Sequence, residues 1–149
     1  LQANMHRAVA GLKVIVKTQN NGVISSNVES IKVHIGGIAE KLNLYTAEPE
    51  NKVKTVAFDL VRSVDNTEMS NAMIMLFPSA ANPLIQLFVT LKDGTVHRLA
   101  RNLSSTLEAN TRLTLNVVIG NIFSGGGTGN FTIENWNEAT ETIEFPMVD

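Results

Sequence analysis

Apolar and polar residues alternate along much of the chain with a period of two, which is the pattern typical of half-buried β-strands. Successive side chains of a strand point to opposite faces, so one face of each such run is predicted to be buried. The clearest runs place apolar residues at Leu12, Val14 and Val16, at Ile31, Val33 and Ile35, at Val56, Phe58 and Leu60, at Ile85, Leu87, Val89 and Leu91, and at Leu113, Leu115, Val117 and Ile119. These runs indicate a protein built of strands.

The segments between the first runs are less regular. We expect the second strand to end at Gly36-Gly37, where glycine permits a bend or crossover. Residues 38–44 fit a short helical turn or a corner equally well, and residues 47–51, which include Pro49, are typical of a loop. Residues 72–77 are almost wholly apolar and predict a strand that is central or buried on both sides. Pro78 ends that strand, because proline cannot donate to a β-ladder.

A hairpin is predicted where Asp93-Gly94 separates two strand-like runs. Both central residues of a type I′ turn need positive φ, which this dipeptide accepts. A connection rich in Ser, Thr and Asn follows over residues 101–110. The glycine-rich segment 125–129 predicts a flexible loop, since no lysine or helix follows it as phosphate-binding loops require.

Near the end of the chain, Ile143, Phe145 and Met147 share one more alternating face. No helix longer than a turn or two is predicted anywhere. Several short strands separated by turns favour a β-sandwich or a β-barrel. With neither an internal repeat nor a linker visible, we expect a single domain over residues 1–149.

Composition narrows the possible functions. The 149 residues, 44% of them hydrophobic, suffice for one domain with a sizeable core. A net charge of -2 and a pI near 5.9 argue against nucleic-acid binding, which needs a basic patch. Absence of cysteine excludes disulfides, thiolate-bound zinc and cysteine nucleophiles.

No apolar run approaches the roughly 18 residues of a membrane helix. Because the chain begins at Leu1, we interpret it as a processed or trimmed fragment, from which a leader or lipid anchor was removed upstream.

Candidate catalytic chemistry is sparse. The histidines His6, His34 and His97 lie far apart and have no metal-ligand spacing, so we expect solvated positions, with His34 and His97 on the polar faces of their strands. No Gly-x-Ser-x-Gly elbow is present, and Glu138 and Glu141 are more simply explained as surface acids. A hydrolytic triad is defined in space and not by sequence position, so a small hydrolase stays a third alternative. The sequence itself predicts no catalytic residue, no cofactor and no metal site, and hence no enzyme.

Trp136 lies between two asparagines and suggests one alternative function. An exposed indole with amides nearby can stack on a sugar, as in a carbohydrate-binding surface module. The competing interpretation is a tryptophan at the rim of the core, which fits the high average burial of large aromatic side chains. Aromatic residues make up only 5% of the chain, fewer than a carbohydrate platform usually shows.

Several phrases of the sequence resemble one family. The opening His6-Arg7-Ala8-Val9-Ala10-Gly11-Leu12-Lys13-Val14 is similar to the first strand of Bacteroidales fimbrillin-like and fimbrial anchor proteins, with Gly11 in place of a usual lysine. Residues 28–38 with 42–46 resemble the second strand and the crossing after it. Similar phrases recur at residues 76–78, at Asp93-Gly94 and at residues 107–115, and Ile133 with Trp136 resembles the frequent Ile-x-x-Trp ending of the family.

This resemblance implies an antiparallel, transthyretin-like sandwich of about seven strands. It also implies export to the cell surface as an outer-membrane lipoprotein, with a role in fimbrial (pilus) assembly or adhesion. The implied partners are other fimbrial subunits or anchor proteins, together with host or bacterial surface receptors. Family members commonly carry two such domains, whereas this chain has room for one. It has no lipidation cysteine, so the implied lipid anchor lies upstream of the chain.

The physical mechanism compatible with this resemblance is β-strand addition. An open sandwich leaves edge strands with unpaired backbone groups, to which a partner's extended segment can add. Ile143, Phe145 and Met147 have the spacing of such a strand-exchange segment, and alternatively form the last strand of the domain's own sheet. Arg7 is a candidate processing site, because fimbrial precursors of this type are often cut after arginine; an ordinary surface arginine is the simpler interpretation.

Overall fold

The computed structural model describes residues 9–18, 22–24, 26, 28–42, 49–119 and 133–142. These residues form strands, turns and loops and contain no helix, and hence none long and apolar enough to cross a membrane. The strands are β1 (Ala10–Thr18), β2 (Val28–Leu42), β3 (Pro49–Asp59), β4 (Val61–Arg62), β5 (Glu68–Ser70), β6 (Ile74–Leu76), β7 (Leu84–Leu91), β8 (Val96–Asn102), β9 (Thr111–Ile119) and β10 (Ile133–Thr142).

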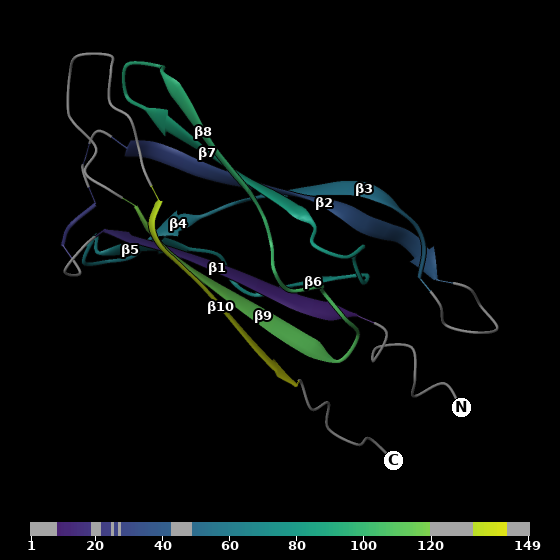
Figure 1. Cartoon of the computed structure of the whole chain (residues 1–149). Coiled ribbons are helices and arrows are strands. Elements are labelled where there is room, and N and C mark those ends of the chain that lie inside the picture. The colour runs from purple at the N-terminus through teal and green to yellow at the C-terminus, as the bar shows by residue number, and fades with distance from the viewer. Residues whose placement is uncertain are drawn as a thin grey trace.

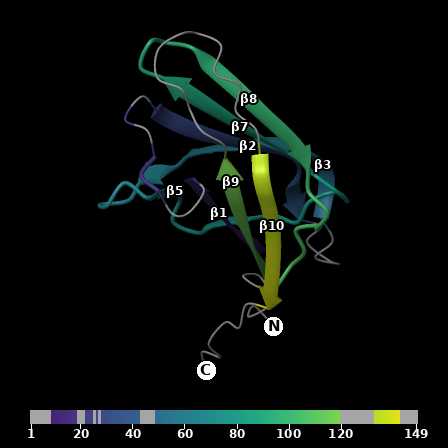
Figure 2. The same ribbon diagram turned by 60° about the vertical axis from the view of Figure 1, so that its left-hand side comes forward.

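The strands form two sheets that pack face to face (Figures 1 and 2). Sheet A has six strands in the order β10-β9-β1-β5-β4, with β6 also paired to β1, and sheet B has the order β3-β2-β7-β8. The predicted all-β sandwich is confirmed. Seven strands have seven or more residues, and β4, β5 and β6 have two or three. All described pairs are antiparallel except β1 with β9, which run parallel.

The core lies between the sheets and consists of the alternate side chains that the sequence pattern predicts. In β9 every second residue from Leu113 to Ile119 is at most 1% exposed, and β1 repeats this pattern beside it. Ile31, Val33 and Ile35 of β2 face this layer from sheet B, together with alternate residues of β7. A fully buried aliphatic side chain contributes about 1.5–3 kcal/mol relative to an exposed one, so this layer is the main source of stability.

The predicted end of the second strand at Gly36-Gly37 is wrong. The strand β2 continues to Leu42, and the glycines lie at a register shift against β3. Gly37 has a φ of 72°, and its carbonyl accepts a hydrogen bond from the Ala80 amide at 2.8 Å. The glycines therefore form a bulge that re-aims a continuing strand. Residues 38–42 are strand instead of a helical turn or corner, and the loop predicted over residues 47–51 is already β3 from Pro49 onward.

The prediction of a central or doubly buried strand over residues 72–77 is also wrong. Only Ile74–Leu76 form a strand, β6, and its sole partner in the described chain is β1. Met73 and Met75 are 37% and 42% exposed. The prediction was wrong because an apolar run shows that a segment is hydrophobic but does not show whether a strand pairs with it on one side or on both. Pro78 follows the end of β6, as predicted.

The hairpin at Asp93-Gly94 is confirmed, joining β7 to β8, but its turn type differs from the prediction. Only Gly94 has positive φ in this loop. The Gly94 amide donates to the Leu91 carbonyl at 2.9 Å, and the Leu91 amide donates to the Thr95 carbonyl at 2.8 Å. This is the pattern of a three-residue loop in which a left-handed glycine follows a tight turn. The Asp93 carboxylate accepts from the Thr95 amide at 2.8 Å, which fixes the loop.

The side chain of Asn71 fills a gap along β1 between two short partners. β5 pairs with Ile15–Lys17 and β6 pairs with Ala10–Leu12, leaving the middle of β1 without a backbone partner on that side. There the Val14 amide donates to Asn71 Oδ1 at 2.7 Å, and Asn71 Nδ2 donates to the Leu12 carbonyl at 3.2 Å. Asn71 is 6% exposed. The side-chain amide of Asn71 thus provides the buried Val14 amide and Leu12 carbonyl with the hydrogen bonds that a paired strand would otherwise provide.

We expect Asn71→Ala to lower the free energy of unfolding by about 1–3 kcal/mol, because it leaves the buried Val14 amide without an acceptor. Urea denaturation measures this value. Asn116→Ala is the matched control, since Asn116 is half-buried on β9 and has no side-chain hydrogen bond in the described part of the chain. An equal effect of the two substitutions would contradict the role assigned to Asn71.

Candidate functional site

The free edges of the two sheets are the places where another extended segment can pair with this protein. Sheet B ends at β3 and β8, and sheet A ends at β10 on one side and at β6 and β4 on the other. Lys52 and Lys54 lie on β3, and Arg98 and Arg101 lie on β8. Charged side chains on an edge strand discourage pairing with another chain, because the added strand would have to cover them.

The β6 edge has no such protection. No charged residue occurs from Asn71 to Leu91, a stretch that includes β6 and the loops on both sides of it. On the side away from β1, no described strand pairs with β6. Met73 and Met75 are partly exposed there, although both are apolar. This edge therefore combines unpaired backbone groups with apolar side chains.

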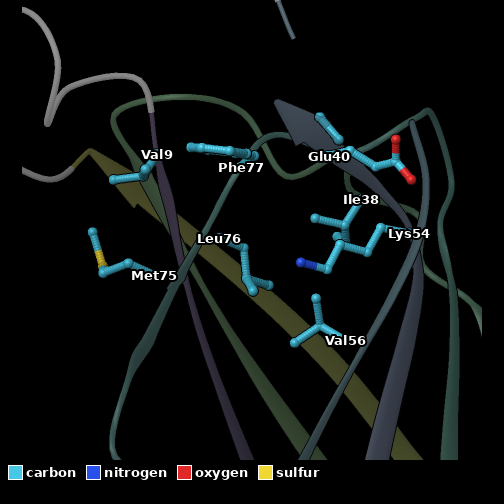
Figure 3. Close-up of a pocket in the computed structure, with 9 residues that line it drawn as sticks. Val9, Ile38, Glu40, Lys54, Val56, Met75, Leu76 and Phe77 are labelled. Atoms are coloured by element: carbon cyan, nitrogen blue, oxygen red, sulfur yellow. The ribbon is translucent and has the colours of Figure 1, made fainter. Parts of the chain in front are cut away.

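A pocket of about 210 Å³ opens between β6 and the facing parts of β2 and β3 (Figure 3). Its lining residues are Val9, Ile38, Ala39, Glu40, Lys54, Val56, Met75, Leu76 and Phe77. Leu76 and Val56 face one another across it, while the ammonium group of Lys54 points inward and the carboxylate of Glu40 points away. Small-molecule sites usually measure about 300–1,000 Å³. The smaller pocket suits one or two apolar side chains.

We call the free edge of β6 together with this pocket the β6 groove. Backbone donors and acceptors along an edge give affinity for an added strand, and an adjacent pocket selects its alternate side chains. No cluster of three or more His, Asp or Glu side chains that could hold a metal ion occurs in the described part of the chain. The groove has the features of a strand-binding site.

Trp136 of the edge strand β10 lies within a cluster of polar side chains and backbone amides. The indole is half-buried against the core, and its Nε1–H donates to Glu138 at 2.7 Å. The guanidinium carbon of Arg101 lies 5.0 Å from the ring centroid. Glu138 also accepts from the amides of Ser104 and Ser105 at 3.0 and 2.9 Å. These contacts attach the edge strand β10 to β8 and to the β8–β9 connection.

The charge of Glu138 is favoured by this cluster. Partial burial acts to raise the pKa of its carboxyl group, but the hydrogen bonds from Ser104, Trp136 and Ser105 outweigh burial and lower the pKa below its ordinary value. The carboxylate therefore remains ionised in mildly acidic solution.

Some of the site residues predicted from the sequence lie within the described structure, and others lie outside it. The indole of Trp136 packs against the core and donates a hydrogen bond to Glu138. These contacts do not favour stacking on a sugar, and sugar binding by Trp136 stays an untested prediction. Ile143, Phe145, Met147 and Arg7 lie outside the described residues, as does His6. His34 lies on the outer face of β2 as predicted. His97 does not lie on an outer face, because it is paired with the buried Val89 on the inner side of sheet B.

The β6 groove was not predicted from the sequence. Its signal is the charge-free stretch from Asn71 to Leu91, in which the apolar run 72–77 was interpreted as a buried strand. An uncharged, apolar segment such as this one forms an apolar sheet edge when only one of its two sides is paired with another strand.

Comparison with known proteins identifies the family. The family model of the fimbrillin-A associated anchor proteins Mfa1 and Mfa2 matches residues 1–142. This chain belongs to that family. The match includes every described residue, both sheets and the β6 groove. No curated protein is similar enough to this chain to count as a match.

Solved structures share the fold at low sequence identity. A candidate cell adhesion protein of Bacteroides ovatus is 16% identical, with a TM-score of 0.51, 94% of this chain covered and 47% of that chain covered. One of Bacteroides uniformis is 13% identical, with a TM-score of 0.52 and coverages of 91% and 50%. One of Bacteroides fragilis is 16% identical, with a TM-score of 0.51 and coverages of 95% and 48%. This chain thus spans about half the length of these structures.

We expect Glu138→Gln to lower the free energy of unfolding at pH 7 by about 0.5–1.5 kcal/mol, the modest range for hydrogen bonds of a partly exposed carboxylate. The pKa of Glu138 is lower in the folded state, so its contribution is present above the unfolded pKa of about 4.3 and is lost as pH falls through the folded pKa. Urea denaturation between pH 7 and pH 3 should show wild type and variant converging at the acidic end.

Glu108→Gln is the control for this titration. Glu108 is exposed, and its carboxylate has no hydrogen bond or ion pair in the part of the chain that the structure describes. A difference between wild type and Glu138→Gln that does not change with pH would contradict the assignment.

Proposed function

We propose that this protein is a non-catalytic component of a fimbrium on a bacterial cell surface, and that it acts in fimbrial assembly and adhesion by β-strand addition. The observation that carries this proposal is the β6 groove, an uncharged sheet edge beside a pocket lined mainly by apolar side chains. Membership of the fimbrillin-A associated anchor family supports the fimbrial role. The partners in strand addition are other fimbrial subunits or anchor proteins. In adhesion, the partners are host or bacterial surface receptors.

The donor in this proposal is the segment containing Ile143, Phe145 and Met147 of a neighbouring subunit. It follows β10, whose last residue, Thr142, is paired with Thr111 at the start of β9. The start of β9 lies beside the start of β1, where β6 also pairs. β10 therefore ends at the end of the sandwich where the β6 groove lies. The apolar side chains of the donor segment would enter the groove at every second residue.

Processing after Arg7 fits this geometry. Val9, two residues further along, lines the pocket of the β6 groove. Cleavage after Arg7 would place a new chain terminus next to the pocket and separate residues 1–7 from it. We propose that such cleavage controls access to the groove.

The remaining assignments follow from the family. We propose that residues 1–149 form one domain of an exported protein, held at the outer membrane by a lipid anchor upstream of this chain. The likeness to about half of each longer solved structure is consistent with one domain of a protein that has two. A transthyretin-like arrangement of the strands is part of the same proposal.

Strand addition at the β6 groove can be tested by disulfide trapping, because the chain has no cysteine of its own. Met75 is paired with Gly11 and faces the outer side of sheet A. If Ile143, Phe145 and Met147 face inward, Glu144 faces the same outer side as Met75. We expect Met75→Cys, mixed with the separate variant Glu144→Cys, to form a mixed disulfide dimer under mild oxidation, identified by mass spectrometry.

Val96→Cys is the matched acceptor control. Val96 is 54% exposed, against 42% for Met75, and it lies on the edge strand β8 of the other sheet. Equal trapping of Glu144→Cys by both acceptors would show random collision. The groove is refuted as the acceptor if Glu144→Cys is trapped equally by both acceptor variants. It is also refuted if Met75→Cys forms no mixed disulfide with Glu144→Cys under assembly conditions.

A further inference from the structure

Phe88 differs from the other described aromatic residues in its position. Phe58, Phe77 and Trp136 all pack against the core cluster, whereas Phe88 does not. It lies on β7 between the buried residues Leu87 and Val89, so its ring stands on the outer face of sheet B. The outer face of a two-layer sandwich is normally polar. The ring therefore lies outside the core between the two sheets.

Polar and cationic side chains surround this ring in a regular way. Lys32 of β2 and Arg98 of β8 are the direct cross-strand neighbours of Phe88 on its two sides. The imidazole of His34 lies against the ring, with centroids 4.7 Å apart and planes inclined by 54°. The Gln86 amide, oriented with its oxygen toward β8, accepts from Arg98 Nε and Nη2 at 3.2 and 2.6 Å. The guanidinium is thus held in place beside the aromatic surface.

The two cations lack the ion pairs that comparable side chains form elsewhere in the molecule. On the outer face of sheet A, Lys17 pairs with Glu68 at 3.8 Å and Arg112 pairs with Glu141. On sheet B, neither Lys32 nor Arg98 forms an ion pair within the described residues, although Asp59 is the cross-strand partner of Lys32. The two cations stand two strands apart, which corresponds to roughly 10 Å between backbones. Their charges remain available to a ligand.

We propose that this outer face of sheet B, formed by Lys32, His34, Gln86, Phe88 and Arg98, binds an acidic polysaccharide. Arg98 and Lys32 would bind carboxylates of sugars along the polymer, since guanidinium and ammonium groups form charge-assisted hydrogen bonds with carboxylates. The ring of Phe88 would cover the apolar face of the sugar between them. Because Lys32, Phe88 and Arg98 are cross-strand neighbours on three adjacent strands, the polymer would cross the strands.

A second copy of this chain is a weaker candidate for this surface. Its edge strand β10 contains Glu134, Glu138 and Glu141, of which the last two are engaged within their own subunit. The proposal is independent of strand addition, because the outer face of sheet B and the β6 groove share no residue.

Polygalacturonate is a suitable probe, and its methyl ester is a matched control that keeps the sugar rings but removes the charges. We expect the full chain to bind polygalacturonate at least tenfold more tightly than the ester or polyglutamate, measured by isothermal titration calorimetry at fixed ionic strength. Arg98→Gln and Phe88→Ala should each weaken binding about fivefold or more. Lys13→Gln, on the outer face of sheet A, should leave binding unchanged.

Phe88→Leu keeps an apolar side chain of similar size and guards against misfolding of the alanine variant. It should weaken polygalacturonate binding while leaving the thermal unfolding midpoint within a few degrees of wild type. Wild-type affinity in Phe88→Leu, or equal binding of polyglutamate and polygalacturonate, would overturn the proposal, because charge alone would then explain the interaction. A dimer in analytical ultracentrifugation that Arg98→Gln dissociates would also overturn it, in favour of a second copy on this face.

Discussion

The dry layer between the two sheets is the constraint on which the rest of the structure depends. Leu12, Val14, Leu113 and Leu115 enter this layer from sheet A and are at most 1% exposed. Because strand side chains alternate strictly, burying one set places the other set on the outer faces. The core thereby determines that Lys32, Phe88 and Arg98 lie on the outer face of sheet B. It also determines which backbone edges are left at the periphery.

Sheet A is incomplete on the side of β1 that faces β6. Two short strands, β5 and β6, pair with opposite halves of β1, and the Asn71 amide satisfies the backbone between them. The short strand β6 is therefore an edge of sheet A in the described part of the chain. The absence of charge from Asn71 to Leu91 leaves this edge without charged side chains that would discourage pairing.

The surfaces assigned to assembly and to ligand binding are physically separate. The β6 groove consists of backbone groups and a pocket lined mainly by apolar side chains, whereas the outer face of sheet B presents Lys32 and Arg98 on either side of an aromatic ring. Charge-assisted contacts weaken as salt screens them, while apolar burial and backbone pairing do not depend on charge. Glu138 and Trp136 hold the edge strand β10 to β8 and to the β8–β9 connection, so β10 is anchored at its middle.

The sequence by itself determined the all-β class, the buried faces of β1, β2, β7 and β9, and the hairpin at Gly94, because each depends on alternation or turn chemistry within a few residues. Only the tertiary structure decided that β2 continues through Gly36-Gly37 and that β1 and β9 run parallel. It also decided that β6 is an edge strand. Each of these depends on which distant segments become neighbours, and the hydrophobicity of a segment is the same whether its second side is covered or open.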